Sequence, residues 1–569
     1  MESSDISLQE ALVQGADSYY QYLVANDLGL DEMGINAYEI KGEELILELK
    51  GRVFDMDLKI SSALFLRVGE KLYPIGENEN IESAFYDETS KKLYLSFASD
   101  FAPLIQKAHK ESLPLALFSD LKFLVSNVQT FFERFGDRVA LPTHIDFNEL
   151  EYIERLSEEQ NEALKIVLQS PLSYVWGPPG TGKTQAVLFE ALLYYIKQGK
   201  KVCVVATTNN ALEQVLSTLI KQFDTLGFER SMILRLGTPT LKFMNAFSEV
   251  CDPSILMQKG AMTLFNFQND LKTRLKSSLV VGVTLDGFIK RYESLELRFS
   301  HIFLDECAFA PLIKTCALCV DNTPLGFFGD HKQLTPVCEM PHNELNKPEN
   351  LYANLWNLSS LYLELFLQDY QDSHFYQTRL SSEPKFEHTQ MIKLSKTHRY
   401  GNNLASILDQ YIYHIGLKGN DKQTELFVLD SGVKSESDTH ISENEARLCA
   451  NLCAYLENED YAVITPFVKQ RQRLFTHRIN RERIFTIHSS QGQEFDNVIF
   501  SPVGLHYHLT NSRQLHALYA LNVAISRIKK RLFIVCDYAF WTHQHGQLIR
   551  AIIEQSTKID ISDIARRLK

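Results

Sequence analysis

The spacing of apolar and polar positions divides the chain into two regimes. In the first, short runs rich in aliphatic and aromatic residues are separated by Gly and Asn turns. The runs are Leu45–Lys50, Val53–Ile60, Leu64–Val68 and Lys92–Phe97. Short strands at this spacing predict a small antiparallel β-barrel, which we place at residues 35–112, after an N-terminal helical segment at residues 1–34. Leu113–Gly136 then has apolar residues at helical period, which predicts one or two helices within residues 113–140.

The second regime begins near residue 150, where apolar runs of four to six residues alternate with helical stretches. Runs of this kind are typical of parallel strands that are buried on both faces. The predicted strands are Ser173–Trp176, Val202–Thr207, Met232–Leu236, Leu279–Val283, His301–Asp305, Leu325–Gly329, Tyr461–Thr465, Asn497–Pro502 and Arg531–Cys536. The fold class is therefore predicted as α/β with two parallel sheets, one at residues 141–385 and one at 386–569.

A phosphate-binding loop follows the first of these strands. The stretch "WGPPGTGKTQ" fits the pattern GxxxxGK[ST] between a predicted strand and a predicted helix. Its glycines let main-chain N–H groups surround a phosphate, Lys183 would reach the β- and γ-phosphates, and Thr184 would hold Mg²⁺. The residues predicted to cradle ATP are Gly177, Pro178, Pro179, Gly180, Thr181, Gly182, Lys183, Thr184 and Gln185.

Two polar stretches end later strands of the same sheet. Asp305 and Glu306 follow the apolar run at His301–Leu304, where Asp305 is expected to bind Mg²⁺ and Glu306 to polarise the attacking water. The polar stretch from Asp330 to Pro336 ends the next strand. Because ligands of open α/β sheets bind at the carboxyl edge, we interpret Gln333 as a sensor of the γ-phosphate and not as a surface-turn residue.

These motifs together resemble superfamily 1 helicases. The branch they resemble is the 5′-to-3′ one that holds the nonsense-mediated-decay RNA helicase, senataxin and the immunoglobulin-mu-binding helicase. The resemblance covers residues 156–536 as an ordered series: "LSEEQNEAL", "ATTNNALEQV", "ILRLGTP", "VVGVT", "DECA", "GDHKQLTP", "LSKTHRYGNNL", "VITPFVKQR", "TIHSSQGQEFDNVI" and "LNVAISRIKKRLFIV". It implies two RecA-like P-loop domains, a preceding β-barrel with a helical stalk, and a helical insertion at about residues 240–278.

The resemblance also implies roles for individual residues. Gln160 would contact adenine, and Glu494 the ribose. Arg399 and Arg527, from the second domain, would stabilise charge on the transferring phosphoryl group. His398 stands where the family has a tyrosine that stacks on adenine, which weakens the expected preference for ATP. Four residues match family positions that hydrogen-bond the sugar-phosphate backbone of a nucleic-acid strand: Thr208, Asn209, Thr284 and Thr486. Each of them has an alternative interpretation as a cap or turn residue.

Composition changes this picture little. Apolar residues make up 45% and charged residues 23% of the 569 residues, as in ordinary folded proteins. The net charge of −13 is compatible only with a local basic groove for nucleic acid. The basic run Lys469–Arg483 is interpreted as a solvated helix face, with phosphate contact as the alternative, and the single CxxC at Cys316–Cys319 does not predict a zinc site. No signal peptide or apolar span is recognised, so a cytoplasmic location is expected, with nucleoid or nucleus as alternatives.

The function expected from these residues is that of an ATP- and Mg²⁺-dependent helicase or translocase moving 5′-to-3′ on single-stranded DNA or RNA. The alternative is a nucleic-acid clamp or sensor that uses ATP only to change conformation. A third hypothesis, a scaffold without hydrolysis, conflicts with the complete set of motor residues. DNA and RNA are not distinguished by the sequence, because that choice depends on contacts to the 2′-hydroxyl.

Overall fold

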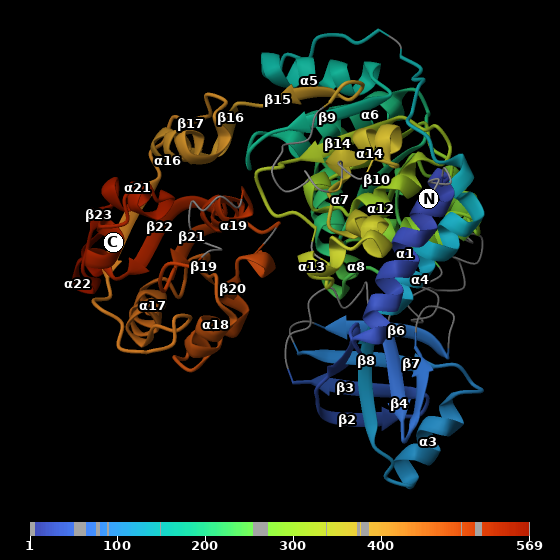
Figure 1. The fold of residues 1–569 in the computed structure, drawn as a ribbon, viewed down its shortest axis with the longest axis horizontal. Helices are drawn as coiled ribbons and strands as arrows, with labels where there is room; N and C mark the ends of the chain where they lie inside the picture. The colour runs from blue at the N-terminus through green and yellow to red at the C-terminus, as the bar shows by residue number, and fades with distance from the viewer. Residues whose placement is uncertain are drawn as a thin grey trace.

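The structure is a computed structural model that describes residues 6–50, 64–75, 80–87, 90–147, 149–253, 271–336, 338–372, 376, 386–490, 492–506 and 515–567. The predicted strand Val53–Ile60 and the middle of the predicted insertion lie outside these residues. The N-terminal sheets lie below the first α/β domain in Figure 1, and the second α/β domain lies to their left. None of the helices described is long and apolar enough to cross a membrane.

The N-terminal region forms two antiparallel sheets around one core. The first sheet has the order β1 (Leu30–Met33), β8 (Leu115–Asp120), β4 (Leu64–Val68) and β5 (Lys71–Pro74). The second has the order β2 (Ile35–Lys41), β3 (Glu44–Leu49), β7 (Lys92–Phe97) and β6 (Ile81–Asp87). Leu47, Leu66 and Leu95 share a buried cluster with α3 (Ala102–Lys110), so both sheets cover the same apolar side chains. The pairing gives two sheets in the described residues, and their closure into a barrel stays a prediction.

The helical prediction for Leu113–Gly136 is wrong over its first part. Leu115–Asp120 forms strand β8, between β1 and β4, and only α4 (Leu121–Phe135) is α-helical. Tertiary pairing decides the conformation here, because an apolar run this short satisfies either period. Asp120 then caps α4 by accepting a hydrogen bond from the main-chain N–H of Lys122 at 2.9 Å. The predicted helical segment 1–34 likewise contains both α1 (Leu8–Ala25) and β1.

Helices α1 and α4 pack side by side and join the N-terminal sheets to the first α/β domain (Figure 1). A capping box between Ser7 and Glu10 begins α1. Further along, Trp356 donates its indole N–H to the carbonyl of Gly15 at 3.1 Å. A Cβ at Gly15 would lie 2.7 Å from the carbonyl oxygen of Tyr352, so only glycine allows this close approach.

The first α/β domain contains a seven-stranded sheet in which every pairing is parallel. Its order is β11 (Ile233–Arg235), β12 (Val280–Thr284), β10 (Val202–Ala206), β13 (His301–Leu304), β14 (Leu325–Gly329), β9 (Leu172–Trp176) and β15 (Gln390–Lys393). Its helical elements include α5 (Glu158–Gln169), η2 (Lys183–Leu188), α6 (Phe189–Lys197), α7 (Asn209–Leu226), α8 (Leu241–Phe247), α10 (Leu271–Ser277), α11 (Leu285–Arg291), α12 (Leu312–Cys316), α13 (His342–Leu345), η8 (Pro348–Trp356) and α14 (Leu363–Asp369).

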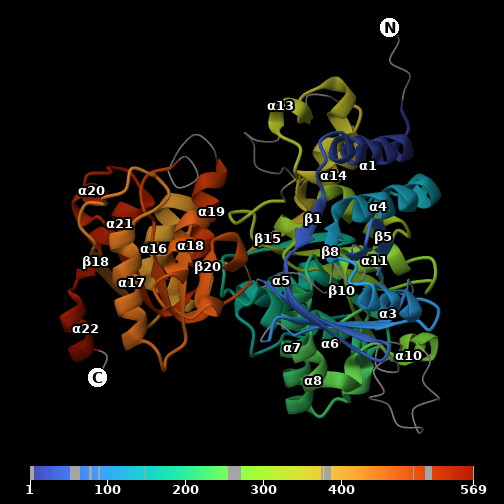
Figure 2. The same ribbon diagram turned by 90° about the horizontal axis from the view of Figure 1, so that it is seen from below.

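The second α/β domain contains a six-stranded parallel sheet. Its order is β20 (Ile484–Thr486), β19 (Tyr461–Thr465), β21 (Phe495–Phe500), β22 (Ile528–Cys536), β18 (Glu425–Asp430) and β23 (Thr557–Lys558), beside a small pair β16 (Lys396–Gly401) and β17 (Lys418–Asn420). Its helical elements include α16 (Asn402–Leu408), η10 (Asp409–Tyr413), α17 (Glu443–Tyr455), α18 (Val468–Phe475), α19 (Leu515–Ile525), α20 (Tyr538–Thr542), α21 (Leu548–Glu554) and α22 (Ile561–Arg567). Figure 2 shows this domain as a separate lobe on the left.

The predicted α/β fold with two parallel sheets is therefore confirmed. The nine strands predicted in the second regime all correspond to strands of these two sheets. One strand lies on the other side of the predicted boundary at residues 385 and 386, because β15 pairs with β9 and so completes the first sheet. The chain then crosses to the second domain between Lys393 and Lys396.

Glu364 fixes the segment that leads into β15. Its carboxylate is 2% exposed and accepts hydrogen bonds of 2.6–2.7 Å from the main-chain N–H groups of Glu387, His388 and Thr389 and from the Thr389 hydroxyl. Burial alone would raise the pKa of Glu364, but the hydrogen bonds from Thr389, His388 and Glu387 outweigh it and lower the pKa.

We expect Glu364→Ala to reduce the free energy of unfolding by about 2–4 kcal/mol, because it leaves buried N–H groups without an acceptor. The folded-state pKa is the lower one, so this contribution is complete above the unfolded value near 4.5 and is lost as the pH falls through the folded value. Urea unfolding at pH 7 and at acid pH measures both effects. The exposed Glu149→Ala serves as control, and equal losses in both variants would contradict this role.

Candidate functional site

The loop Gly177–Gly182 leaves the carboxyl end of β9 and turns tightly before η2. Gly180 and Gly182 have φ angles of +81° and +86°, a region that residues with a Cβ rarely adopt. A Cβ at Gly182 would lie 2.5 Å from Nε2 of Gln160, so the loop also lacks space for one. The successive N–H groups of the loop and the first turn of η2 therefore form the concave surface expected of a phosphate-binding loop.

Lys183 and Thr184 lie where this loop meets the acidic end of β13. The Lys183 ammonium donates hydrogen bonds to the carbonyls of Gly177 at 2.6 Å and Pro178 at 3.2 Å. The Thr184 hydroxyl lies 3.3 Å from both carboxylate oxygens of Asp305. Burial lowers the pKa of Lys183, although the carboxylates of Asp330, Glu306 and Asp305 oppose this shift. The structure thus brings together the lysine, hydroxyl and carboxylates that the sequence placed in one site.

Asp305 and Thr184 are suitable ligands for Mg²⁺. Burial and the neighbouring Glu306 raise the pKa of Asp305 to about 7, while Lys183 lowers it. A divalent cation would stabilise the ionised form of such a carboxylate, and hydroxyl and carboxylate oxygens are the ligands Mg²⁺ prefers. Glu306 has a φ of +50°, which is uncommon for a residue with a side chain and is characteristic of strained functional positions.

The first segment of the second domain lies directly on the phosphate-binding loop. The Thr397 hydroxyl donates to the carbonyl of Pro179 at 2.7 Å, and the main-chain N–H of His398 donates to the carbonyl of Gly180 at 2.8 Å. A Cβ at Gly180 would lie 2.5 Å from Cβ of Arg399. Gly180 therefore serves two purposes, since its positive φ turns the loop and its missing side chain admits strand β16.

Both predicted arginines are positioned by hydrogen bonds to main-chain carbonyls of the second domain. Arg399 forms an ion pair with Glu494 and donates to the carbonyl of Ser526 at 3.0 Å. Arg527 is 3% exposed and donates to Val523 O at 3.0 Å and to the side-chain oxygen of Gln333 at 3.1 Å. Burial and the nearby Arg399 lower the pKa of Arg527 to about 10, so it stays charged at neutral pH. The pair Arg527–Gln333 links the second domain to the predicted phosphate sensor.

A buried carboxylate, Asp330, organises the junction between the domains, and the sequence analysis did not assign it a role. Asp330 accepts hydrogen bonds from Trp176 Nε1 at 3.0 Å, Gln333 Nε2 at 3.1 Å and the Tyr413 hydroxyl at 2.7 Å. Asn522 in turn donates to the Tyr413 hydroxyl at 2.7 Å and to the carbonyl of Lys332 at 2.7 Å. The sequence shows that Asp330 begins a polar turn, but it does not show that the distant Trp176 and Tyr413 contact it.

The other predicted ATP contacts surround the loop. Gln160 is buried, donates to the carbonyl of Thr181 at 3.1 Å and accepts from the main-chain N–H of Ser157 at 3.1 Å within the capping box of α5. The exposed side chain of His398 and the paired Glu494 lie on the second-domain side. Gln185 lies in the first turn of η2, where its carbonyl accepts from Gln222 at 3.2 Å.

The four predicted strand contacts lie at or just after the carboxyl ends of β10, β12 and β20. Thr208 and Thr284 cap α7 and α11, accepting hydrogen bonds from Ala211 N at 3.2 Å and Gly287 N at 3.1 Å. Asn209 is 5% exposed and accepts a hydrogen bond from Arg235. Thr486 donates to Ser489 Oγ at 3.1 Å. Their contact with a nucleic-acid strand therefore stays a prediction. Thr208, Thr284 and Thr486 have the cap or turn role that was their alternative, whereas Asn209 contacts the distant Arg235.

Comparisons with known proteins agree with this arrangement. Two family models, each described as an AAA domain, match residues 155–278 and 366–539, and together they cover more than half of the chain. The first range contains the phosphate-binding loop, and the second contains both arginines.

Three relatives illustrate what the sequence is similar to. The regulator of nonsense transcripts 1 of Dictyostelium discoideum is 24% identical over 70% of this chain and 32% of its own length. SMUBP-2 of Rattus norvegicus, named a DNA-binding protein, is 24% identical over 68% of this chain and 43% of its own length. An uncharacterized ATP-dependent helicase of Methanocaldococcus jannaschii is 23% identical over 68% of both chains.

Among solved structures, the arterivirus nonstructural protein 10 helicase covers 91% of this chain and 80% of its own, with 14% identity and a TM-score of 0.40. The chain spans between about one third and two thirds of the lengths of the relatives named above. The sequence relatives, the two domain matches and the ordered motifs lead to one conclusion. The chain belongs to the superfamily 1 helicases, in the group related to the regulators of nonsense transcripts and SMUBP-2.

Proposed function

We propose that this protein is an ATP-dependent translocase or helicase that moves 5′-to-3′ on single-stranded DNA or RNA. The observation that carries the proposal is the contact between Gln333 of the first domain and Arg527 of the second. In the proposed roles, a phosphate sensor and a transition-state cation would form one hydrogen-bonded pair across the domain junction. Hydrolysis at such a junction can change how the two domains pack.

Each motor residue has a role that its position supports. Lys183 would neutralise the β- and γ-phosphates, and Thr184 and Asp305 would hold Mg²⁺, which shields phosphate charge when it is bound. Glu306 would orient the attacking water. Arg399 and Arg527 would stabilise the transferring phosphoryl group, an effect that can increase the rate about 10³–10⁵-fold. Gln160, Glu494 and His398 would contact the nucleoside.

Movement along a strand would follow from opening and closing of the junction. Thr208 follows β10 and Thr284 ends β12 in the first sheet, and Thr486 ends β20 in the second. Contacts to phosphate and sugar from both sheets would let one domain hold the strand while the other moves. Such contacts are independent of base sequence.

The alternative function is a clamp or sensor that closes on nucleic acid when ATP binds but does not move processively. The hydrogen bonds from Thr397 and His398 to carbonyls of the phosphate-binding loop favour this alternative, since they join the second domain to the loop that would hold the phosphates.

Steady-state ATP hydrolysis with and without equal-length single-stranded DNA or RNA tests the proposal. A translocase is expected to be stimulated at least tenfold by one or both polymers. ATP binding without stimulation by either would contradict a strand-coupled motor and support the switch. Movement of a fluorophore-labelled 3′ or 5′ end past the protein then measures direction.

Lys183→Ala is expected to lower ATP turnover at least 100-fold while the protein stays folded, because it removes the ammonium that contacts the loop carbonyls of Gly177 and Pro178. Phosphate release measures turnover, and circular dichroism measures folding. Lys221→Ala, on the exposed face of α7, is the control. Turnover near that of the unsubstituted protein in Lys183→Ala would exclude the assigned site.

Tyr413→Phe is expected to reduce strand-stimulated turnover about 5- to 30-fold while affinity for ATP changes little. The phenyl ring keeps the packing, but the hydroxyl that joins Asp330 to Asn522 is lost, and a buried bond of this kind is worth about 1–2 kcal/mol. Tyr411→Phe, in the same helical segment η10, is the matched control. A change in the Michaelis constant alone would contradict a coupling role.

Binding to single strands is expected to weaken steeply with salt, since the predicted contacts are to phosphates. Fluorescence anisotropy of a labelled oligonucleotide between 50 and about 200 mM salt measures the slope. Binding that is insensitive to salt would instead indicate base stacking as the main source of affinity.

A further inference from the structure

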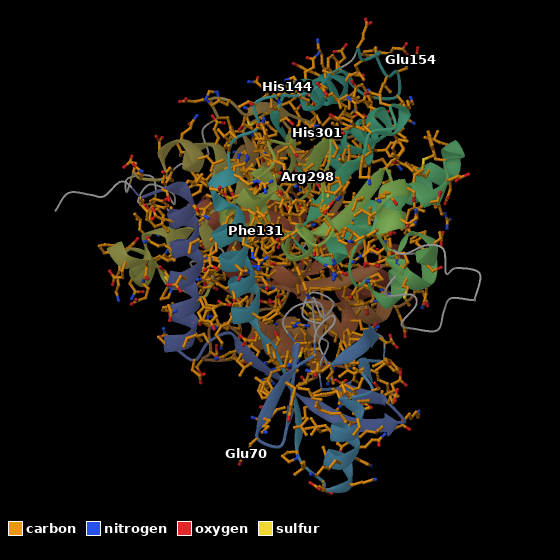
Figure 3. All side chains as sticks on the ribbon, turned by 90° about the vertical axis from the view of Figure 1, so that its right-hand side faces the viewer. Glu70, Phe131, His144, Glu154, Arg298 and His301 are labelled. Carbon is orange, nitrogen blue, oxygen red and sulfur yellow. The ribbon has the colours of Figure 1, made fainter. Side chains whose placement is uncertain are left out.

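A cavity of about 330 Å³ opens at the amino edge of the first sheet. Lys201 directly precedes β10 in its lining, and Phe299 lies two residues before β13. The carboxyl end of β13 is followed by Asp305, and a strand rises about 3.3 Å per residue, so the cavity lies on the order of 15 Å from the ATP site. Figure 3 shows Arg298, another lining residue, below His301 on the face turned toward the viewer.

Cations dominate the lining. Lys201, Lys272, Lys276 and Arg298 contribute positive charge, and Glu296 is the acidic residue in the lining. In a chain with a net charge of −13, this is a local reversal of sign. Lys272 and Lys276 lie one helical turn apart on α10 and so project on the same side.

These lysines are not explained by ion pairs. Within the part of the chain that the structure describes, Lys201, Lys272 and Lys276 have no carboxylate partner, although Arg298 pairs with Asp321 at 3.1 Å. Like charges that gather without counterions repel one another, and a bound anion would offset that cost.

Lys201 is a half-buried member of this group. Its ammonium donates to the carbonyl of Leu275 near the end of α10, and burial lowers its pKa. One hydrogen bond leaves the ammonium with further donors directed to its surroundings. A phosphate oxygen in the cavity would accept from it.

The floor of the cavity is apolar. Leu275 and Leu297 are 8% and 2% exposed, and the half-buried Phe299 ring completes the floor. An apolar floor below a cationic rim suits a ligand that combines a flat ring with a phosphate, because aromatic rings stack on bases and lysines pair with phosphate. The volume is within the range of small-ligand sites.

We propose that this cavity is a second nucleotide-binding site, in which Lys201, Lys272 and Lys276 hold a phosphate ester and Phe299 contacts the base. The phosphate ester comes either from a free nucleotide or from a nucleic-acid strand. The site is separate from the ATP site, and binding there requires no ATP hydrolysis.

Acetylation of individual lysines, followed by mass spectrometry on the full chain, tests the proposal. The probes are thymidine monophosphate and an eight-residue oligothymidylate without a terminal phosphate. At saturating probe, acetylation of Lys272 and Lys276 is expected to slow at least fivefold, while Lys107 and Lys110 on α3 change less than twofold. Protection by the mononucleotide alone identifies a free nucleotide as ligand, and protection by the oligonucleotide identifies a strand.

Arg298→Glu is expected to abolish this protection, with the exposed Arg481→Glu of the second domain as control. Lys183→Ala is expected to retain it, so failure of the ATP site and failure of this cavity give different results. The proposal is overturned if neither probe protects, if Lys107 and Lys110 are protected equally, or if Arg298→Glu keeps full protection.

Discussion

The burial of Asp330 constrains the whole junction between the two α/β domains. A carboxylate removed from water needs hydrogen-bond donors, and here they come from Trp176, Gln333 and Tyr413, which belong to three separate parts of the chain. Separation of the domains would take Tyr413 away from Asp330. The relative position of the domains is thus tied to the donors around one side chain, and Gln333, one of those donors, also contacts Arg527.

The phosphate-binding loop adds a steric constraint to this electrostatic one. Strand β16 can lie on the loop only because position 180 has no side chain. The Thr397 and His398 bonds then occupy loop carbonyls that would otherwise face solvent. Gly180 therefore determines both the local conformation of the loop and the docking of the second domain on it.

The sequence predicted those parts of the structure that depend on local pattern. Buried parallel strands such as Val202–Ala206 have continuous apolar runs, and the phosphate-binding loop has a fixed spacing of Gly, Lys and Thr. The strand predictions that failed concern segments whose pairing partners are distant in the chain. Leu115–Asp120 is a strand because β1 and β4 flank it, β15 joins the first sheet through β9, and β18 was not recognised although Leu426–Leu429 is apolar. Tyr413 gave no signal, since its importance comes from one hydroxyl placed between two domains.

The two domains contribute their site residues from opposite ends of their strands. The first domain contributes residues that follow its strands, such as Asp305 after β13, whereas the second contributes Glu494 and Arg527, which precede β21 and β22. The carboxyl edge of the first sheet thus faces the amino edge of the second sheet, an arrangement that repeated domains in a ring or filament also have. Two domains of similar architecture consequently occupy unequal positions, and the carboxyl edge of the second sheet, where Thr465 and Thr486 lie side by side, is left outside the junction.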